Sequence, residues 1–494
     1  MKTIAEIISW LKAADNIRTI LVEIDDVLVQ GSQSATLYLA NRPFVTNSSD
    51  IPVNTTYDPC LVGGVSFSEN LSLDNSISIG YGDLEIDNTD GSKDSWLNYV
   101  WTNRKLRVYI GDASWSRDDY TLIFSGLVSD IVSRNRDRIN LVLVDKLQRL
   151  NNPISETLLE SSELGSETLI PVIFGECFNV TPLVASSSAL TYQVHTGPIE
   201  DIIEVRDNGV PVSFTKNVAA GKFTLNQTPY GQITCSAQGA KDVGIYYNTI
   251  PGIIRLIVKS YGPVNTRLTD SDIDLANFRQ FETLYPYPVG VYCTSRENIL
   301  EVCNRLANSI GAQLTFSNLG LLKLVRLDMS GTGTSHTVNP VDLESKSLNI
   351  ADKSVVRAAT KLGYCKNWTV QPSGLAAGVN PASIPLFNTE YLFESVVDAS
   401  VATRYVLTTE PEPENTLLIT VAGAQAECAR RNNLFKVPRT VYSMTAYPHL
   451  LLVNLGDTIN LNNSRFDLAN TKSGIIVSIN RDWISGRVTL GVLV

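Results

Sequence analysis

Apolar and polar residues alternate along much of this chain, as they do in β-strands that bury one face. Residues 18–29 and 79–87 form two such segments, and the second runs into an Asn/Asp/Gly turn ending at Gly91. Another hairpin is predicted at Asn208-Gly209, because both central residues of a type I′ turn need positive φ. The pattern therefore predicts a mainly β protein.

Helical periodicity is confined to a few segments. Thr3 and Glu6 have the spacing of a capping box before an amphipathic helix over residues 3–11. The most regular helix is predicted to start at Ser295 and to end at Gly311, and a strand pair over 313–317 and 321–327 follows it. Further helices are expected over 252–259, from Asp270 or Asp272 to about 281, and over 417–433, the last one capped by the acidic, proline-rich segment 410–415.

Two hairpins that lie far apart in the sequence share one pattern. Each has a Gly-Asp turn, a strand that starts with Ser-Gly, and a return strand that starts with Arg followed by alternating apolar residues. We therefore predict a duplicated β-module whose structural repeat residues are Gly111, Asp112, Gly126, Arg138, Gly456, Asp457, Gly474 and Arg487. Closed cyclic symmetry repeats whatever each subunit presents, so a trimer of such chains would present six module positions.

The modules divide the chain into four predicted domains. Residues 1–165 hold the first module, 166–290 form a β-rich insertion, 291–350 form a small α+β helix-hairpin domain, and 351–494 hold the second module. Residues 367–388, rich in Pro, Gly, Ala and Ser, are interpreted as an exposed excursion. The predicted fold class is mainly β with α+β insertions, in which two duplicated β-modules bracket intermediate domains.

Charge and hydropathy exclude several classes of function. The net charge of −10, without a run of like charges, leaves no surface to neutralise phosphates, so specific nucleic-acid binding is not expected. Glu6, Lys12 and Asp15 interrupt the apolar residues of the N-terminal segment, so no secretion signal is expected. No segment approaches the roughly 20 apolar residues of a membrane span, and stable membrane insertion is not expected either.

The residues that usually carry chemistry are dispersed. The seven cysteines lack a C-x-x-C pair and are interpreted as buried, reduced thiols. His195, His336 and His449 stand apart from any nucleophile motif. The acidic turn over 87–94 fails as a calcium loop, since placing Gly91 sixth leaves both essential carboxylate positions apolar. We expect no enzymatic centre, cofactor or metal, although a glycosidase carboxylate pair has no sequence signature and stays open.

Several segments together resemble the hub proteins at the tail tip or baseplate of long-tailed bacteriophages. They are residues 20–23, 38–44, 82–91, 96–97, 124–126, 170–180, 456–459 and 465–468. The resemblance implies a trimeric hub in which two tail-tube-like β-barrels per subunit form a pseudo-sixfold ring.

Such a hub would lie in the virion after assembly in the host cytoplasm. It would join the tail tube to the tip and line or close the channel through which DNA leaves. Its partners would be further copies of itself, the tail tube or a distal tail protein, other tip or fibre proteins, and the tape measure protein. Two alternatives stay open: a tail-associated glycan-binding or glycan-degrading protein, and a β-sandwich adhesin, which the missing secretion signal disfavours.

Overall fold

The computed structural model describes residues 2–13, 15–30, 33–63, 66–71, 77–144, 146–159, 168–328 and 336–494. They fold as two compact units, each built from segments that are distant in the sequence. The first unit comprises Met1–Gln148, Thr315–Ser354 and Pro438–Val494, and the second comprises Arg149–Leu314 and Val355–Val437. The four consecutive domains expected from the sequence do not coincide with these units, and their boundaries stay a prediction.

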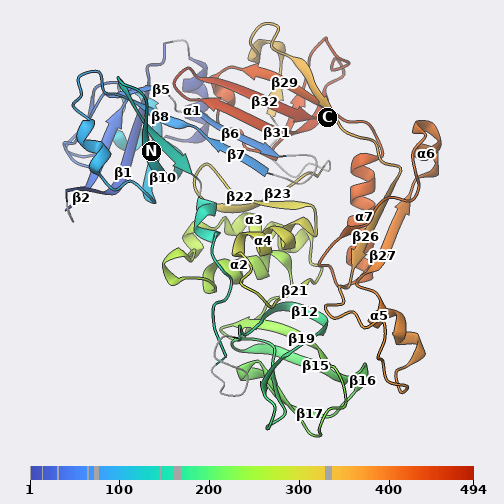
Figure 1. Cartoon of the computed structure of the whole chain (residues 1–494). Coiled ribbons are helices and arrows are strands. Elements are labelled where there is room, and N and C mark those ends of the chain that lie inside the picture. Colours follow the sequence, from blue (N-terminus) through green and yellow to red (C-terminus); the bar gives the residue numbers. More distant parts are fainter. Residues whose placement is uncertain are drawn as a thin grey trace. The chain divides into compact units, whose positions relative to one another are not determined.

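The fold is mainly β, as predicted, and the first unit contains a seven-stranded antiparallel sheet with the order β2-β1-β9-β10-β11-β8-β5 (Figure 1). Its strands are β1 (Arg18–Gln30), β2 (Gln33–Ala40), β5 (Leu61–Gly63), β8 (Asp83–Asp87), β9 (Arg104–Asp112), β10 (Thr121–Asn135) and β11 (Arg138–Val144). A short hairpin of β3 (Phe44–Val45) and β4 (Thr56–Tyr57) and the 3-10 helices η1 (Asp94–Asn98) and η2 (Arg117–Asp119) lie in the connections between these strands, and the 3-10 helix η3 (Lys146–Leu150) follows β11.

The second sheet of this unit combines strands from both ends of the chain. Its main path is β24-β30-β31-β32-β29-β25, and β6 pairs with both β31 and β7. In Figure 1 the blue strand β6 lies beside the red strand β31. The elements are β6 (Ser66–Leu71), β7 (Ile77–Tyr81), β24 (His336–Val338), η7 (Pro340–Asp342), β25 (Asn349–Lys353), β29 (Thr440–Ala446), η9 (Pro448–Leu450), β30 (Thr458–Leu461), β31 (Lys472–Asp482) and β32 (Arg487–Leu493).

The N-terminal helix α1 (Ile4–Lys12) forms as predicted. The Thr3 side chain accepts from the Glu6 amide, and the Glu6 carboxylate accepts from the Thr3 amide, so the capping box is confirmed. Ile7 and Leu11 are buried, and the helix packs near η9 of the same unit. This helix is therefore held by one apolar stripe.

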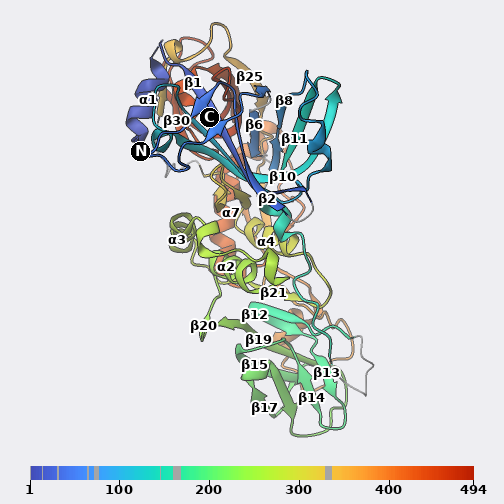
Figure 2. The same cartoon turned by 90° about the vertical axis from the view of Figure 1, so that its left-hand side faces the viewer.

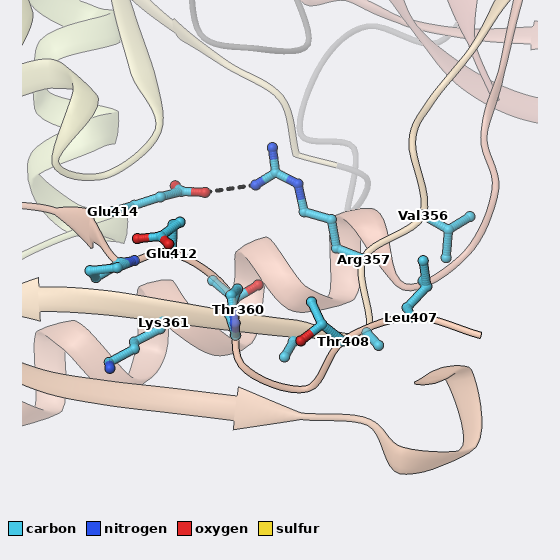
Figure 3. A pocket seen from close by; sticks show the side chains of 12 residues that line it. Val356, Arg357, Thr360, Lys361, Leu407, Thr408, Glu412 and Glu414 are labelled. Atoms are coloured by element: carbon cyan, nitrogen blue, oxygen red, sulfur yellow. Dashed lines mark hydrogen bonds and ion pairs between the residues drawn. The ribbon is translucent and has the colours of Figure 1, made fainter. Parts of the chain in front are cut away.

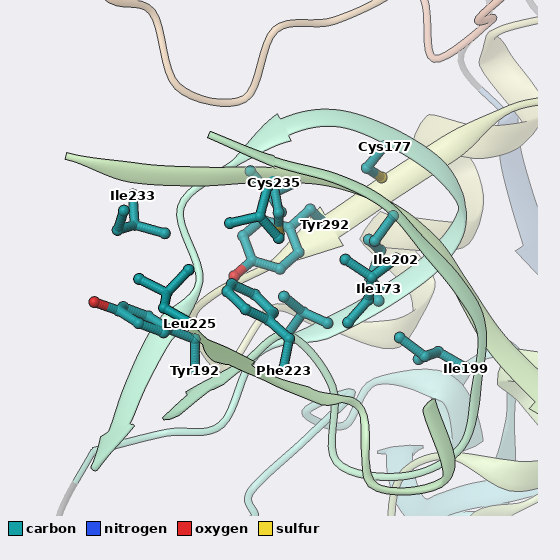
Figure 4. Close-up of a cluster of buried hydrophobic side chains, with 14 residues drawn as sticks. Ile173, Cys177, Tyr192, Ile199, Ile202, Phe223, Leu225, Ile233, Cys235 and Tyr292 are labelled. Carbon is teal, nitrogen blue, oxygen red and sulfur yellow. The ribbon is translucent and has the colours of Figure 1, made fainter. Parts of the chain in front are cut away.

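The second unit contains two more sheets that enclose an apolar core. One has the order β16-β15-β19-β12-β21, with β20 paired to β19, and the other is β13-β14-β18-β17 (Figure 2). Fourteen buried residues from these strands form one cluster, in which the rings of Tyr192 and Phe223 stack at 5.3 Å (Figure 4). Positive φ at Asn208 and Gly209 confirms the predicted turn. The elements are β12 (Val172–Val180), β13 (Leu183–Ser186), β14 (Thr191–Gln193), β15 (Ile199–Asp207), β16 (Val210–Pro211), β17 (Phe214–Asn217), η4 (Val218–Ala220), β18 (Lys222–Leu225), β19 (Ile233–Asp242), β20 (Ile245–Tyr246) and β21 (Gly290–Cys293).

The second unit also contains several helices and a small third sheet, β27-β26-β28. Helix α2 packs against α3 and α4, and α7 packs against β26 and β27. The predicted strand pair appears as β22 (Ala312–Phe316) and β23 (Leu322–Arg326), where the chain passes from the second unit to the first. The remaining elements are α2 (Ile250–Ser260), η5 (Val264–Thr266), η6 (Asp270–Asp272), α3 (Leu275–Leu284), α4 (Ile299–Asn308), β26 (Ala359–Tyr364), η8 (Pro381–Ser383), α5 (Ile384–Asn388), β27 (Leu392–Val397), α6 (Ala399–Tyr405), β28 (Glu414–Asn415) and α7 (Val421–Phe435).

The predicted starts of three helices were wrong by a few residues. Asp274, Asn298 and Thr420 cap α3, α4 and α7, in place of Asp270 or Asp272, Ser295 and the segment 410–415. Each real cap accepts a hydrogen bond from an amide in the first turn. Because several Asp, Ser, Thr and Asn residues precede each helix, sequence alone does not select the one within reach.

The segment 367–388, predicted to be an exposed excursion, is anchored at both ends. Asn367 is buried, and its amide group donates to the carbonyl oxygens of Leu386 and Phe387 at 3.0 and 2.9 Å. Phe387 is also buried and lies near the ring of Phe178, with centroids 5.8 Å apart. One buried amide therefore closes the segment into a loop with helical turns of its own.

Candidate functional site: two sheets with one strand order

Four consecutive strands in each sheet of the first unit follow the same path. Strands β8 to β11 are arranged as β9-β10-β11-β8, and strands β29 to β32 are arranged as β30-β31-β32-β29. All neighbours in both sets are antiparallel. The chain therefore makes the same four-stranded arrangement twice.

The residue pairing within the central hairpins is also the same. In the first, Val128 pairs with Leu143 and Asp130 with Val142, so one residue is left over in β10. In the second, Ile476 pairs with Val492 and Ser478 with Gly491, which leaves one residue over in β31. Both bulges follow the repeat glycine, Gly126 or Gly474, by the same number of residues. A β-bulge bends and twists a strand, so both hairpins bend at equivalent points.

The two repeat glycines lie against equivalent backbone atoms. A Cβ on Gly126 would lie 3.2 Å from the carbonyl oxygen of Val144 and 2.5 Å from the ring of Phe124. A Cβ on Gly474 would lie 2.5 Å from the carbonyl oxygen of Leu493. Val144 and Leu493 are the residues that follow the paired residues Leu143 and Val492. The glycines therefore permit close packing against the return strand.

The Gly-Asp pairs, in contrast, do not occupy equivalent places. Gly111 and Asp112 end strand β9, whereas Gly456 and Asp457 precede strand β30. Strand register matches Gly456 with Asn103 instead, and both have positive φ. The Asn103 amide donates to the carbonyl oxygen of Val128 at 2.8 Å, and the Gly456 amide donates to that of Ile476 at 2.9 Å. The proposed equivalence of Gly111 with Gly456 was therefore wrong, because the same dipeptide occurs at a strand end and in a turn. Asn103 was missed, although Asn is the non-glycine residue most at ease at positive φ.

The repeat arginines begin the return strands and form ion pairs with acidic side chains. Arg138 lies close to Asp87 and 3.6 Å from Glu85. Arg487 lies 2.8 Å from Glu344, and about two-thirds of its side chain is exposed. These contacts are at the surface and do not form a reactive centre.

A strand from the first half of the chain joins the second sheet to the first. Strand β6 pairs antiparallel with β31, from Ser66↔Asp482 to Asn70↔Ser478. Phe67 of β6 stacks on Phe124 of β10 with ring centroids 4.2 Å apart, and both rings are buried. No pattern in the sequence indicated this pairing, which closes a very long loop.

A buried ion pair accompanies the β6–β31 pairing. Arg481 is 1% exposed and its Nη1 lies 2.8 Å from Oε1 of Glu69, which is also buried. Its Nε donates to the carbonyl oxygen of Leu451 at 2.9 Å. Because these bonds satisfy both charges away from water, loss of either partner would leave an uncompensated buried charge.

One cavity, of about 360 Å³, lies in the second unit between residues 356–361 and residues 407–414 (Figure 3). It is lined by Glu412 and Glu414, but Glu414 forms an ion pair with Arg357 at 2.6 Å. None of its twelve lining residues is aromatic. The cavity therefore lacks the aromatic walls and the free carboxylate pair expected of a glycosidase cleft.

The remaining candidate residues lie in structural positions. His195 is buried in the second unit, its Nδ1 accepts from the Ile173 amide at 3.2 Å, and burial lowers its pKa to about 4. Six of the seven cysteines are buried, Cys365 is half-buried, and burial raises the pKa of Cys235 to about 12. Within the described ranges, no group of three or more His, Cys, Asp or Glu side chains could hold a metal, and no helix is long and apolar enough to cross a membrane.

Comparison with known proteins gives matches only at the level of structure. No family model and no curated protein sequence matches the chain. The 43 kDa tail protein of prophage MuSo2 from Shewanella oneidensis is 13% identical, with 97% of this chain and 98% of that chain covered and a TM-score of 0.41. A prophage tail protein from Listeria monocytogenes is 10% identical over 96% and 94% of the two chains, with a TM-score of 0.42. A tail protein from Neisseria meningitidis is 9% identical over 97% and 96%, with a TM-score of 0.37.

The Shewanella and Listeria structures are prophage tail proteins, in agreement with the resemblance of the sequence to tail proteins of bacteriophages. With identities of 13% or less and TM-scores below 0.5, they do not assign a function. The geometry of the two sheets is therefore the feature of this chain that bears on its function.

Proposed function

We propose that this protein is a structural hub of a bacteriophage tail tip or baseplate, and that three copies form a pseudo-sixfold ring. The observation that carries the proposal is the repeated strand order of β8–β11 and β29–β32, with the same pairing register and the same bulge. Two equivalent arrangements within one compact unit supply two ring positions per subunit, so threefold symmetry yields six.

The place of the ring follows from the sequence resemblance to tail hub proteins. In that place the ring joins a sixfold tail tube to a threefold tip and lines or closes the channel through which DNA leaves. The net charge of −10 supports this role, because a channel without a basic surface does not retain passing phosphates. The tail tube or a distal tail protein, other tip or fibre proteins, and the tape measure protein are its proposed neighbours in the virion.

The proposal assigns no enzymatic activity to the chain. Its function lies in interfaces, and the second unit is an insertion that the hub presents to other proteins of the tip. A purified sample should therefore leave peptidoglycan and envelope polysaccharide intact. Cleavage that a single Asp or Glu substitution abolishes would replace the structural proposal with the glycan-degrading alternative.

Native mass spectrometry of the purified full chain tests the oligomer. We expect a species of three times 54.1 kDa, and class averages of electron micrographs with six similar densities around a centre. Gold-labelled antibody against the chain should mark the tail tip of virions. A stable monomer or dimer at micromolar concentration, or label along the tail shaft, would contradict the proposal.

A further inference from the structure

The two sheets of the first unit differ at one edge. Strand β30 pairs with β31 before the bulge, at residues 472–475. After the bulge, strand β6 of the same chain pairs with residues 478–482 along the same edge of β31. Strand β10 continues in the same way beyond its bulge, but β9 pairs with it only as far as Val128. Among the described residues, no strand pairs with residues 130–135 of β10 on that side.

This stretch of β10 is open to solvent. Asp130, Ser133, Arg134 and Asn135 are exposed. The amide of Ile131 donates to the carboxylate of its own neighbour Asp130 at 2.8 Å. A side chain that accepts a hydrogen bond from the adjacent backbone amide takes the place of a hydrogen bond to a neighbouring strand. The Ile131 amide therefore has an acceptor although no strand pairs with this edge.

Strand β25 is the counterpart of β6 in the second module. Strand β6 pairs with β7, which leads into β8, whereas β25 pairs with β29, which corresponds to β8. Strand β25 thus pairs with the first strand of its module, whereas β6 pairs with the strand that directly precedes β8 and follows, along the chain, β5, which pairs with β8 itself. Strand β6 covers β31, but all five residues of β25 are exposed.

At the outer edge of β25, as at the open edge of β10, a backbone amide donates its hydrogen bond to the carboxylate of the preceding residue. The amide of Ser354 donates to Arg439 at 2.9 Å on the side of β29, so the preceding amide, that of Lys353, points away from the sheet. The Lys353 amide donates to the carboxylate of its own neighbour Asp352 at 2.7 Å. Two open edges, one in each module, thus share one local arrangement.

We propose that strand β25 of one copy pairs antiparallel with residues 130–135 of β10 of a second copy, and so repeats between subunits the contact that β6 and β31 make within each chain. The occupant of each edge is thereby a second copy of this chain, and the inference rests on the proposed ring. Each edge carries charges of both signs, Asp352 and Lys353 on β25 and Asp130 and Arg134 on β10, which suits pairing with each other. Arg134 is held by Asp83 of its own chain at 2.6 Å, so Asp130 opposite Lys353 is the charge pair that the contact would add. On pairing, the Lys353 and Ile131 amides exchange their carboxylate acceptors for carbonyl oxygens.

A proline at Lys353 tests the inference, because proline removes the outward amide and leaves the Ser354–Arg439 bond in place. The matched control is Lys353→Ala, which removes the charge but keeps the amide. We expect Lys353→Pro to raise the concentration at which the trimer half-dissociates by roughly tenfold or more, since three equal contacts each lose a hydrogen bond. Lys353→Ala should change it by less than about threefold. Both variants are checked for unchanged far-ultraviolet circular dichroism.

Cross-linking tests the same contact without depending on the fold of a proline variant. A chain that carries both Lys353→Cys and Ser133→Cys is treated with a short bis-maleimide, with the wild type and each single variant as controls. We expect covalent dimers and trimers of the double variant only. If the wild type is a trimer and Lys353→Pro leaves its stability unchanged, the inference is overturned but the proposed ring is not. The same holds if the wild type is a trimer and the double cysteine variant gives no cross-links between chains. A wild-type chain that stays monomeric would overturn the ring itself, and the carboxylate-held amides would then serve to protect edges from aggregation.

Discussion

The two sheets of the first unit share their backbone arrangement but not the means by which they are held. Both have the same strand order, register, bulge and glycine packing. The second sheet is covered by β6 and has the Arg481–Glu69 ion pair, whereas the corresponding edge of the first sheet is open. The two sheets therefore keep one backbone geometry while their edges differ, because a covered edge and an open one need different side chains.

The largest effect is expected at the buried ion pair that only the second sheet has. Arg481→Ala leaves Glu69 buried without a partner and should lower the free energy of unfolding by about 3–5 kcal/mol. Replacing both partners, as Arg481→Met with Glu69→Met, should restore most of that loss. Denaturant unfolding measures all three proteins, and a loss below about 1 kcal/mol for Arg481→Ala would show that β6 is not anchored there.

The repeat glycines offer a graded comparison of the two modules. Gly474→Ala places a Cβ 2.5 Å from a backbone oxygen, whereas Gly126→Ala places it 3.2 Å from the corresponding oxygen and against the movable ring of Phe124. We expect losses in unfolding free energy of about 2–3 kcal/mol for Gly474→Ala and about 1–2 kcal/mol for Gly126→Ala. Gly197→Ala is the control, because nothing lies within 4 Å of its Cβ position. Equal effects at all three positions would argue against the shared packing.

A smaller effect separates the corrected equivalence from the one predicted from the sequence. Gly456 has a φ of 88° and Asn103 a φ of 62°, so Gly456→Ala should lower the unfolding free energy by about 1–2 kcal/mol. Gly456→Asn should cost less, and Asn103→Gly should change stability by only a few tenths of a kcal/mol. Thermal unfolding of these variants decides the matter. A larger loss of unfolding free energy for Gly456→Asn than for Gly456→Ala would contradict the structural equivalence of Gly456 and Asn103.

The smallest effects are expected at the repeat arginines. Arg138→Ala and Arg487→Ala remove ion pairs at the surface, and each should cost about 0–1 kcal/mol in unfolding free energy. That cost should shrink further in 1 M salt, where screening weakens surface charge pairs. A salt-independent loss of more than about 2 kcal/mol at either arginine would indicate a buried role that its exposure does not suggest.

The features that depend on neighbours along the chain could be predicted from the amino-acid sequence. Alternation of apolar residues defined the hairpins β10–β11 and β31–β32, and the spacing of Thr3 and Glu6 defined the cap of α1. The shared Ser-Gly and Arg positions pointed to these two hairpins, because a hairpin fixes its own register through its turn and its bulge, and their origin in one duplicated module stays a prediction. The predicted starts of three helices were wrong because several residues that can cap a helix precede each one. The predicted match of Gly111 with Gly456 was wrong because the same Gly-Asp dipeptide occurs at a strand end and in a turn.

The pairing of distant segments, in contrast, could be seen only in the folded chain. Glu69 and Arg481 carry no signal in the sequence, yet they meet in a buried ion pair because β6 crosses from the first module to the edge of β31. The same long-range closure builds each compact unit from separate segments, so the units do not follow the order of the chain in the way that the four expected consecutive domains do. Strand pairing satisfies backbone groups that are the same in every residue, so the partner of an edge is chosen by packing and burial in three dimensions rather than by the order of side chains along the chain.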